Sequence, residues 1–247
     1  MNVGLVFFAY GGDAQLLRLA LQAVPLLRAQ GHAVTAYVLE DAAAPLGELG
    51  MPEGCCRRWQ TSWARCGNLN GVDCIVGMVD EYNRIFEQHA HEWLLKVDCD
   101  TFVNSLDWLE GLSSKEVAFA GTVHVRDYCS GACYAVSREG AEWLQARLLE
   151  RSWRDKAERG YCEDRVLCSM CRLSGMKVHA LDGRSGEIAG KLCHAWQGEP
   201  RSFAELREAY AVDFKACRWN SAPHRWELDH AEAVERMRNY VKEVTNG

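Results

Sequence analysis

The sequence predicts an α/β fold, with a Rossmann-like, mixed but mostly parallel central sheet flanked by helices. The first observation is a strand–helix–strand unit, in which apolar runs over 2–10 and 33–39 enclose apolar residues at helical spacing over 16–27. Such a unit places its two strands in parallel through a right-handed crossover. The second observation is the apolar run Trp93–Val97. Its length and makeup are typical of a strand buried on both faces inside a parallel sheet.

The size and composition of the chain narrow the possibilities. Its 247 residues, 48% of them hydrophobic and 25% charged, are enough for one large α/β domain or a domain with a small appendage. The formal net charge of −6 does not indicate an extended nucleic-acid surface. The chain enters an apolar strand without a basic start or cleavage site, and no stretch is long enough to span a membrane. We therefore expect a cytoplasmic protein with no membrane span.

The loop after the first strand is the first candidate site. Residues 9–12 follow the carboxyl end of that strand, where open α/β sheets bind ligands, and Tyr10 can stack on a base. The G-x-G-x-x-G pattern of dinucleotide-binding loops is absent, and a plain tight turn explains the glycines as well as a nucleotide site does. In the helix that follows, we expect Asp13 to cap the start, Pro25 to introduce a kink and Gly31 to end it.

A second candidate site lies at the start of the next long helix. Trp59 is expected to end a short strand, and the glycine- and asparagine-rich loop 65–71 then opens a helix whose apolar face runs over 72–86. Backbone donors at a helix N-terminus, together with Arg65, can hold a phosphate. An ordinary capped helix is the alternative.

The remaining elements follow the run Trp93–Val97. In order, the patterns predict a short helix over 105–112, strands over 117–123 and the second half of 128–138, helices over 139–151 and 166–173, a strand over 176–181, and helices over 203–210 and 231–244. Ser202 and Glu205 form a capping-box pattern for the helix over 203–210. Cys193 and His194 fall in a predicted loop.

Two aspartates with one residue between them, Asp98 and Asp100, end the central run. In an extended chain, residues i and i+2 point the same way, so we expect the two carboxylates to converge at the carboxyl end of the strand. Two close carboxylates repel each other and need a cation. Mg²⁺ or Mn²⁺ binds one or two carboxylates and fills its other positions with water and phosphate oxygens. A chance triplet or an ordinary Asx turn is the alternative.

Neighbouring residues exclude two other uses of this motif. A calcium loop starting at Asp98 needs glycine at its sixth position and glutamate at its twelfth, where the chain has Val103 and Leu109. A phosphatase of the haloacid dehalogenase type has Thr or Val at the fifth position, where the chain has Phe102, and its motif follows the first strand.

Twelve cysteines are a high number for this length. Without an export signal they do not indicate disulfides. Cys168 and Cys171, with Cys162 before them and Cys193 after them, could form a zinc site, but the spacing lacks two paired knuckles. Others, such as Cys74, lie in apolar contexts where thiols simply pack.

Four motifs, in their order along the chain, resemble one family. They are Lys96-Val97-Asp98-Cys99-Asp100-Thr101-Phe102-Val103, then Tyr128-Cys129-Ser130-Gly131-Ala132-x-Tyr134-x-x-Ser137-Arg138, then Glu163-Asp164, and then His194. Over roughly residues 90–196 the chain resembles the fringe-like and β1,3-galactosyltransferase-like glycosyltransferases, which have the GT-A fold. It departs from them at Cys99 and Ala132, where a third acidic residue and a second glycine are usual. Their N-terminal membrane anchor and lumenal disulfides are not evident in the sequence.

The resemblance implies a role for each motif. Asp98, Asp100 and His194 bind Mn²⁺ (or Mg²⁺) on the donor diphosphate, the Ser-Gly-rich stretch lines the donor and acceptor sites, and Asp164 or Glu163 is the general base. With the two candidate loops included, the expected donor-binding residues are Ala9, Tyr10, Gly11, Asp41, Arg65, Asn68, Asn70, Lys96, Asp98, Ser130 and Gly131. For His194 the alternative is a packed or surface histidine, and for Glu163 and Asp164 it is the negative charge favoured at a helix N-terminus.

These expectations agree with the chemistry of sugar transfer. A bound cation can act as a Lewis acid on the departing diphosphate, and a positioned carboxylate can deprotonate the attacking hydroxyl. We therefore predict a metal-dependent, inverting glycosyltransferase that moves a sugar from a UDP-sugar to a hydroxyl of a glycan, protein, small molecule or modified nucleic acid. The alternatives are a nucleotidyltransferase acting on a sugar phosphate and a non-catalytic nucleotide-sugar-binding protein.

The sequence patterns also predict how the chain is divided into structural parts. Residues 1–200 are expected to form the GT-A domain, with a nucleotide-sugar-binding half over 1–104 and an acceptor-side half over 105–200. Residues 201–247 are expected to form a helical extension packed on the same domain.

Overall fold

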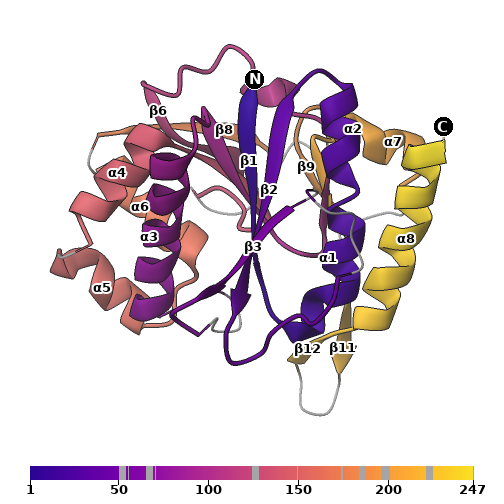
Figure 1. Ribbon diagram of the computed structural model, residues 1–247, viewed down its shortest axis with the longest axis horizontal. Helices are drawn as coiled ribbons and strands as arrows, with labels where there is room; N and C mark the ends of the chain where they lie inside the picture. Colours follow the sequence, from indigo (N-terminus) through magenta and orange to yellow (C-terminus); the bar gives the residue numbers. More distant parts are fainter. Residues whose placement is uncertain are drawn as a thin grey trace.

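A computed structural model describes residues 1–49, 54, 56–64, 69, 71–123, 128–148, 150–173, 175–183, 187–195, 201–220 and 225–246, with the backbone alone for 151–152, 217–220 and 225–228. Within these residues the chain forms a central seven-stranded sheet, a three-stranded sheet and a two-stranded ribbon. Figure 1 shows the central sheet between two groups of helices.

The central sheet has the strand order β3-β2-β1-β4-β7-β6-β8. Its strands are β1 (Asn2–Ala9), β2 (Ala33–Asp41), β3 (Cys56–Thr61), β4 (Trp93–Val97), β6 (Val117–Val123), β7 (Cys133–Ser137) and β8 (Lys177–Asp182). Strand β7 is antiparallel to its neighbours β4 and β6, and the other described pairings in this sheet are parallel. The sheet is therefore mixed and mostly parallel, as predicted.

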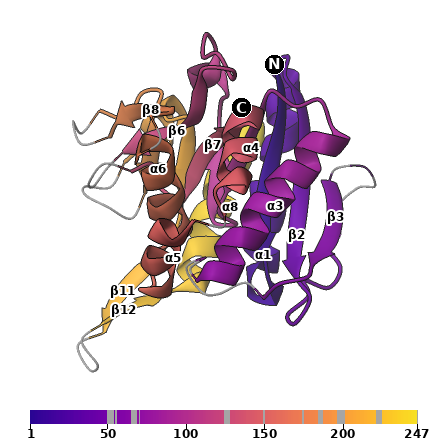
Figure 2. The ribbon, with the colours of Figure 1, turned by 90° about the vertical axis from the view of Figure 1, so that its left-hand side faces the viewer.

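Helices cover both faces of this sheet. Helices α1 (Ala14–Ala20), α2 (Ala23–Ala29) and α8 (His230–Asn246) lie on one side, and α3 (Val72–Gln88), α4 (Arg138–Ala146), α5 (Arg151–Glu158) and α6 (Glu163–Leu173) on the other (Figures 1 and 2). Alternate residues of a strand face opposite layers. In β1, Leu5 and Phe7 pack with the first group, whereas Val6 and Phe8 pack with the second. Within the described residues, no helix has the length and apolar character that crossing a bilayer requires.

The helical segment between β1 and β2 is divided in two. A 3₁₀ turn, η1 (Gly11–Asp13), precedes α1, and Asp13 Oδ2 accepts the Tyr10 backbone N–H (3.2 Å) instead of capping α1. The break between α1 and α2 includes Leu21, four residues before Pro25. A proline ring clashes with the carbonyl at that distance, which explains why the predicted kink lies there. Gly31 follows α2 with a φ of +93°, a conformation that glycine adopts readily, and ends the segment as predicted.

A three-stranded sheet joins the C-terminal part of the chain to the segment after β4. Strand β10 (Ala211–Asp213) lies between β5 (Thr101–Val103), to which it is antiparallel, and β9 (Leu192–His194), to which it is parallel. Residues 201–246 thus contain α7 (Phe203–Glu208) and α8, as predicted, and also β10 and a ribbon of β11 (Cys217–Asn220) and β12 (Arg225–Leu228). The capping box of Ser202 and Glu205 is present at the start of α7.

Three predicted elements differ from those observed. The helix expected over 139–151 ends early, since α4 stops at Ala146, where the indole N–H of Trp153 donates to the Arg147 carbonyl oxygen (2.9 Å), and a further helix that was not predicted, α5, begins at Arg151. The helix expected over 105–112 is one 3₁₀ turn, η2 (Asp107–Leu109). His194, expected in a loop, belongs to β9, because β10 supplies a partner strand that local sequence does not reveal.

Candidate active site

A cavity of about 320 Å³ opens at one edge of the central sheet. The carboxyl ends of β1 and β4, the segment before β7 and the start of α6 meet there, because β7 runs antiparallel to β4. The predicted site residues that line the cavity are Tyr10, Lys96, Asp98, Asp100, Ser130, Gly131, Glu163, Asp164 and His194. Among the lining residues that were not predicted as site residues are Asp13, Asp213, Lys215 and His230.

Other predicted donor-binding residues do not line this cavity. Ala9 is buried in β1, the Gly11 N–H donates to a backbone carbonyl in the segment after β2 (2.7 Å), and Asp41 accepts the backbone N–H two residues on (2.8 Å). The predicted residues Arg65, Asn68 and Asn70 lie outside the described residues. The first loop therefore contributes Tyr10 to the cavity, while its first glycine shapes a turn.

Asp98 and Asp100 lie in a turn, not in an extended strand. Strand β4 ends at Val97, and the Thr101 N–H donates to the Asp98 carbonyl oxygen (3.0 Å). The alternation of side chains along a strand, from which their convergence was predicted, therefore does not apply. Both side chains nevertheless line the cavity, because the turn itself lies at its rim.

Three carboxylates gather on this side of the cavity. Asp213, at the end of β10, joins Asp98 and Asp100. Burial raises the pKa of Asp100 well above its usual value, and the negative charges of Asp213 and Asp98 raise it further, while the positive charge of Lys215 partly offsets them. The carboxylates are thus held together at an electrostatic cost that a bound cation would offset.

His194 faces the same carboxylates. It lies beside Asp213 in the parallel register of β9 and β10, and its Nδ1 is 2.5 Å from Asp213 Oδ2. Its Nε2 is 3.4 Å from Ser130 Oγ, at the cavity. A carboxylate that holds one ring nitrogen fixes the tautomer and the orientation of the ring, as carboxylates do for metal-binding histidines. Asp213 was missed because its three-residue strand is too short to give a recognisable period.

The donor set fits a divalent cation. Carboxylate oxygens and an imidazole nitrogen are ligands that Mn²⁺ accepts, and the cluster brings both kinds together. A separate group at the amino end of β2, formed by His32, Asp107 and Glu110, has its ligand atoms within 4.8 Å of one another, with both carboxylates exposed. The ligand atoms of Asp98, Asp100 and His194 are not gathered that closely, and Asp98 Oδ1 is paired with Lys96 instead.

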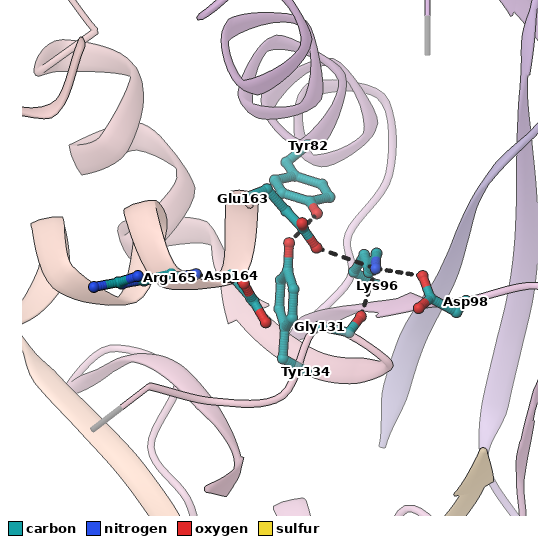
Figure 3. Close-up of polar contacts among 8 residues, drawn as sticks. All are labelled: Tyr82, Lys96, Asp98, Gly131, Tyr134, Glu163, Asp164 and Arg165. Atoms are coloured by element: carbon teal, nitrogen blue, oxygen red, sulfur yellow. Dashed lines mark hydrogen bonds and ion pairs between the residues drawn. The ribbon is translucent and has the colours of Figure 1, made fainter. Parts of the chain in front are cut away.

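Next to these carboxylates, and sharing Asp98 with them, lies a buried network around Lys96 (Figure 3). The ammonium lies 2.5 Å from Asp98 Oδ1 and 3.1 Å from Glu163 Oε1, and it also donates to the Gly131 carbonyl oxygen. Burial by itself would lower the pKa of Lys96, but the charges of Asp98 and Glu163 raise it above its usual value. Lys96 is therefore a permanent cation inside the protein.

The two candidate bases, Glu163 and Asp164, have different surroundings at the start of α6. Glu163 points toward Lys96 and lies 3.1 Å from its ammonium, whereas the Asp164 carboxylate points toward Gly131 (Figure 3). Burial raises the pKa of Glu163 to about 8, an effect that Lys96 only partly offsets. Burial also raises the pKa of Asp164, and its carboxylate accepts the Arg165 N–H (2.6 Å). Of the two carboxylates, Glu163 therefore forms the ion pair with Lys96, and Asp164 does not.

Gly131 explains why the Ser-Gly-rich stretch contains a glycine at this point. A Cβ placed there would lie 2.9 Å from Asp164 Oδ2 and 3.3 Å from Glu163 Oε1. Any side chain would therefore push against both carboxylates. The stretch passes over the start of α6 only because this residue has none.

The four cysteines considered for zinc do not meet. Cys193 packs in the layer of α1, α2 and α8, whereas Cys168 and Cys171 pack in the layer of α3 to α6. The central sheet lies between these layers, so Cys193 cannot share a zinc ion with Cys168 and Cys171. Cys168, Cys171 and Cys193 pack in the core, as was expected for other cysteines such as Cys74.

Comparisons with known proteins bear on the fold. No protein-family model and no curated protein matches the chain. Among similar solved structures is a glycosyltransferase involved in the glycosylation of the major capsid of PBCV-1, with a TM-score of 0.54 and 12% identity over 97% of this chain and 100% of that one. Another is the galactosyltransferase LgtC in complex with donor and acceptor sugar analogues, with a TM-score of 0.55 and 12% identity over 97% and 95%. The predicted GT-A fold is confirmed.

Proposed function

We propose that the chain is a metal-dependent glycosyltransferase that moves a sugar from a UDP-sugar to an acceptor hydroxyl, with inversion. One observation carries the proposal: a single cavity, in a fold shared with glycosyltransferases, is lined by gathered carboxylates beside His194 and, separately, by Asp164. The first group suits a cation with a diphosphate, and the second suits a general base. The resemblance to fringe-like and β1,3-galactosyltransferase-like enzymes supports a UDP-sugar as the donor.

The acidic side of the cavity is the proposed donor site. Asp100, His194 through Nε2 and one oxygen of Asp98 would hold the cation, which when bound neutralises charge on the departing diphosphate. Asp213 orients His194, and Lys215 adds positive charge beside the same carboxylates. Tyr10 offers an aromatic face to the uracil base. These residues hold the donor so that its anomeric carbon faces the rest of the cavity.

Asp164 is the proposed base for the acceptor. As the acceptor oxygen attacks the anomeric carbon, its proton passes to the Asp164 carboxylate, and the bond from that carbon to the diphosphate oxygen breaks with its electron pair left on the diphosphate. A single displacement of this kind inverts the anomeric configuration. The raised pKa of Asp164 makes it a stronger base than an exposed aspartate.

A panel of UDP-sugars with Mn²⁺, scored by UDP release and by NMR of the product anomer, tests the proposal. We expect release to depend on Mn²⁺ and on one donor sugar, and the product to have the opposite anomeric configuration. Retention of configuration would contradict the single displacement. Turnover of nucleoside triphosphates with sugar phosphates would instead support a nucleotidyltransferase, and donor binding without turnover would support a binding protein.

A further inference from the structure

Lys96 occupies an unusual place for a charged residue. It lies in β4, in the middle of the central sheet, beside Val6 of β1 and Tyr134 of β7, and its side chain is 2% exposed. Lysine is almost never buried to this degree unless it is paired. An apolar residue of similar volume would fill the position without the cost of removing an ammonium from water.

Three oxygen atoms surround the ammonium, which donates hydrogen bonds to two of them and forms an ion pair with the third, that of Glu163. They are Asp98 Oδ1 just after β4, Glu163 Oε1 at the start of α6, and the Gly131 carbonyl oxygen in the segment before β7. Figure 3 shows the three acceptors on different sides of the nitrogen. One side chain thus joins three segments that are far apart in the sequence and that all reach the cavity.

We propose that Lys96 is a positioning residue that fixes the donor side and the acceptor side of the cavity relative to each other, and that Glu163 serves as its partner and not as the base. The inference rests on the proposed function, because the two sides are defined by the donor and the acceptor. It adds to that function an assignment between the two adjacent carboxylates of α6.

On the donor side, the contact restricts what Asp98 can do. Its Oδ1 is occupied by Lys96, and the Asp98 backbone N–H donates to the Ala132 carbonyl oxygen (2.9 Å). The Asp98 side chain is 31% exposed, so its other oxygen remains accessible. Asp98 therefore offers a single oxygen, in a fixed direction, to a cation or to the donor.

On the acceptor side, Gly131 carries the contact onward. Its carbonyl oxygen accepts from Lys96, and its Cα lies against the Asp164 carboxylate, since a Cβ there would be 2.9 Å from Asp164 Oδ2. Without the ammonium, Asp98 Oδ1 and the Gly131 carbonyl oxygen would both lose their hydrogen-bond donor. The direction of the base and the direction of Asp98 would then no longer be set by one group.

The test separates positioning from a merely structural ion pair. Lys96→Met keeps the length of the side chain and removes the charge, Glu163→Gln keeps the shape and a hydrogen-bonding oxygen, and the double variant contains both changes. Lys242→Met, on the exposed face of α8, is the matched control. For each variant, urea unfolding gives the stability, calorimetry gives UDP affinity with Mn²⁺, and UDP release gives kcat.

We expect Lys96→Met to lower UDP affinity tenfold or more and to lower kcat, and Glu163→Gln to keep kcat within about threefold of the wild type, less than the hundredfold scale of a lost base. The double variant should regain part of the stability that Lys96→Met loses, since the buried Glu163 carboxylate no longer lies beside the missing ammonium, but it should not regain UDP affinity. Recovery of affinity along with stability would show a structural role only. A hundredfold loss of kcat in Glu163→Gln, with affinity kept, would make Glu163 the base.

Failure of the proposed function is distinguishable from failure of this inference. If the wild-type protein binds no uridine nucleotide, the proposed function fails, and the positioning role that rests on it fails too; if the wild type binds the nucleotide and Lys96→Met binds it equally well, the inference alone fails. Strictly additive effects of Lys96→Met and Glu163→Gln on the stability would show that the two residues do not interact, which would overturn the proposal that Glu163 is the partner of Lys96. A non-additive result would keep it.

Discussion

Two parts of the cavity differ in the charges that lie beside their carboxylates. Around Lys96, the carboxylates of Asp98 and Glu163 meet a buried cation within 3.1 Å. Beside them, Asp100 is half-buried next to Asp213, and removal from water together with the negative charges of Asp213 and Asp98 holds its pKa above the usual range. The protein itself supplies the cation beside Asp98 Oδ1 and Glu163, whereas the positive charge of Lys215 only partly offsets the negative charge around Asp100.

The comparison shows where a ligand is expected. A buried carboxylate that is already paired holds the structure together, and its loss is felt as a loss of stability or alignment. Carboxylates that raise one another's pKa destabilise the protein alone and gain when a cation arrives. The predictions below therefore differ from one acidic residue to the next, in metal binding, turnover or stability, according to the groups that surround its carboxylate.

The largest effect is expected at Asp100. Asp100→Ala should remove Mn²⁺-dependent UDP binding, with a loss of about a hundredfold or more, because a direct ligand matters at least as much as the groups that orient ligands. Calorimetry with UDP and Mn²⁺ measures this. Asp107→Ala, whose side chain is 75% exposed on η2, is the control and should bind as the wild type does. Unchanged affinity in Asp100→Ala would refute the metal assignment.

The same residue should have the opposite effect on stability. Since burial and neighbouring negative charge disfavour the ionised form of Asp100, Asp100→Asn should raise the urea midpoint of the metal-free protein at neutral pH. A fall in the midpoint would show that the carboxylate is stabilised by contacts that outweigh the repulsion.

A loss of turnover without a loss of binding is expected at Asp164. Asp164→Asn keeps the shape and removes the basicity, so kcat should fall by roughly a hundredfold, the usual scale of a lost general base. UDP affinity with Mn²⁺ should stay nearly constant, because Asp164 lies apart from the gathered carboxylates. Normal turnover on a confirmed acceptor would mean that another group takes the proton.

An intermediate effect is expected at Asp213, which holds His194 Nδ1. Asp213→Asn should weaken Mn²⁺ binding by roughly 10–100-fold, the usual range for a group that orients a metal ligand. His194→Ala should weaken it at least as much. Titration of Mn²⁺ followed by electron paramagnetic resonance measures both, and a Mn²⁺ affinity in His194→Ala equal to that of the wild type would remove the histidine from the site.

The smallest effect concerns pH and Glu163. Its folded pKa is raised to about 8 from an ordinary 4.5, chiefly by burial, so folding favours the protonated form. The contribution to stability is full below pH 4.5 and is lost as the pH rises through 8. Between pH 6 and 9 the wild-type protein should therefore lose more stability than Glu163→Gln in urea unfolding. Parallel curves would mean that Glu163 is ionised at little cost throughout this range.

Most of the fold follows from patterns along the chain. The strand–helix–strand start, the buried run Trp93–Val97 and the long helix α3 were predicted because apolar periodicity reflects burial directly. The helix expected over 139–151 was drawn too long, and α5 after it was missed, because the charged composition of α5 gives little apolar periodicity. Patterns of this kind report local structure and say little about which distant segments pair.

The candidate site was predictable to the extent that it resembled a known family. Asp98, Asp100, Asp164 and His194 were predicted through the order of motifs, and the structure places them around one cavity. The contribution of Asp213 was not predictable, since it depends on the pairing of β10 with β9. The bridging contacts of Lys96 likewise depend on how α6 packs against β4, which no local pattern encodes.

The position of β10 has a consequence for the order in which the protein folds during synthesis. Val212 pairs with Phe102 on one side and with Cys193 on the other, so the strand closes contacts between segments that leave the ribosome at very different times. Non-local pairings of this kind form late, because the intervening chain must first be brought together. A nascent chain that ends before residue 211 therefore lacks Asp213, and the acidic side of the cavity is among the last features of the molecule to be assembled.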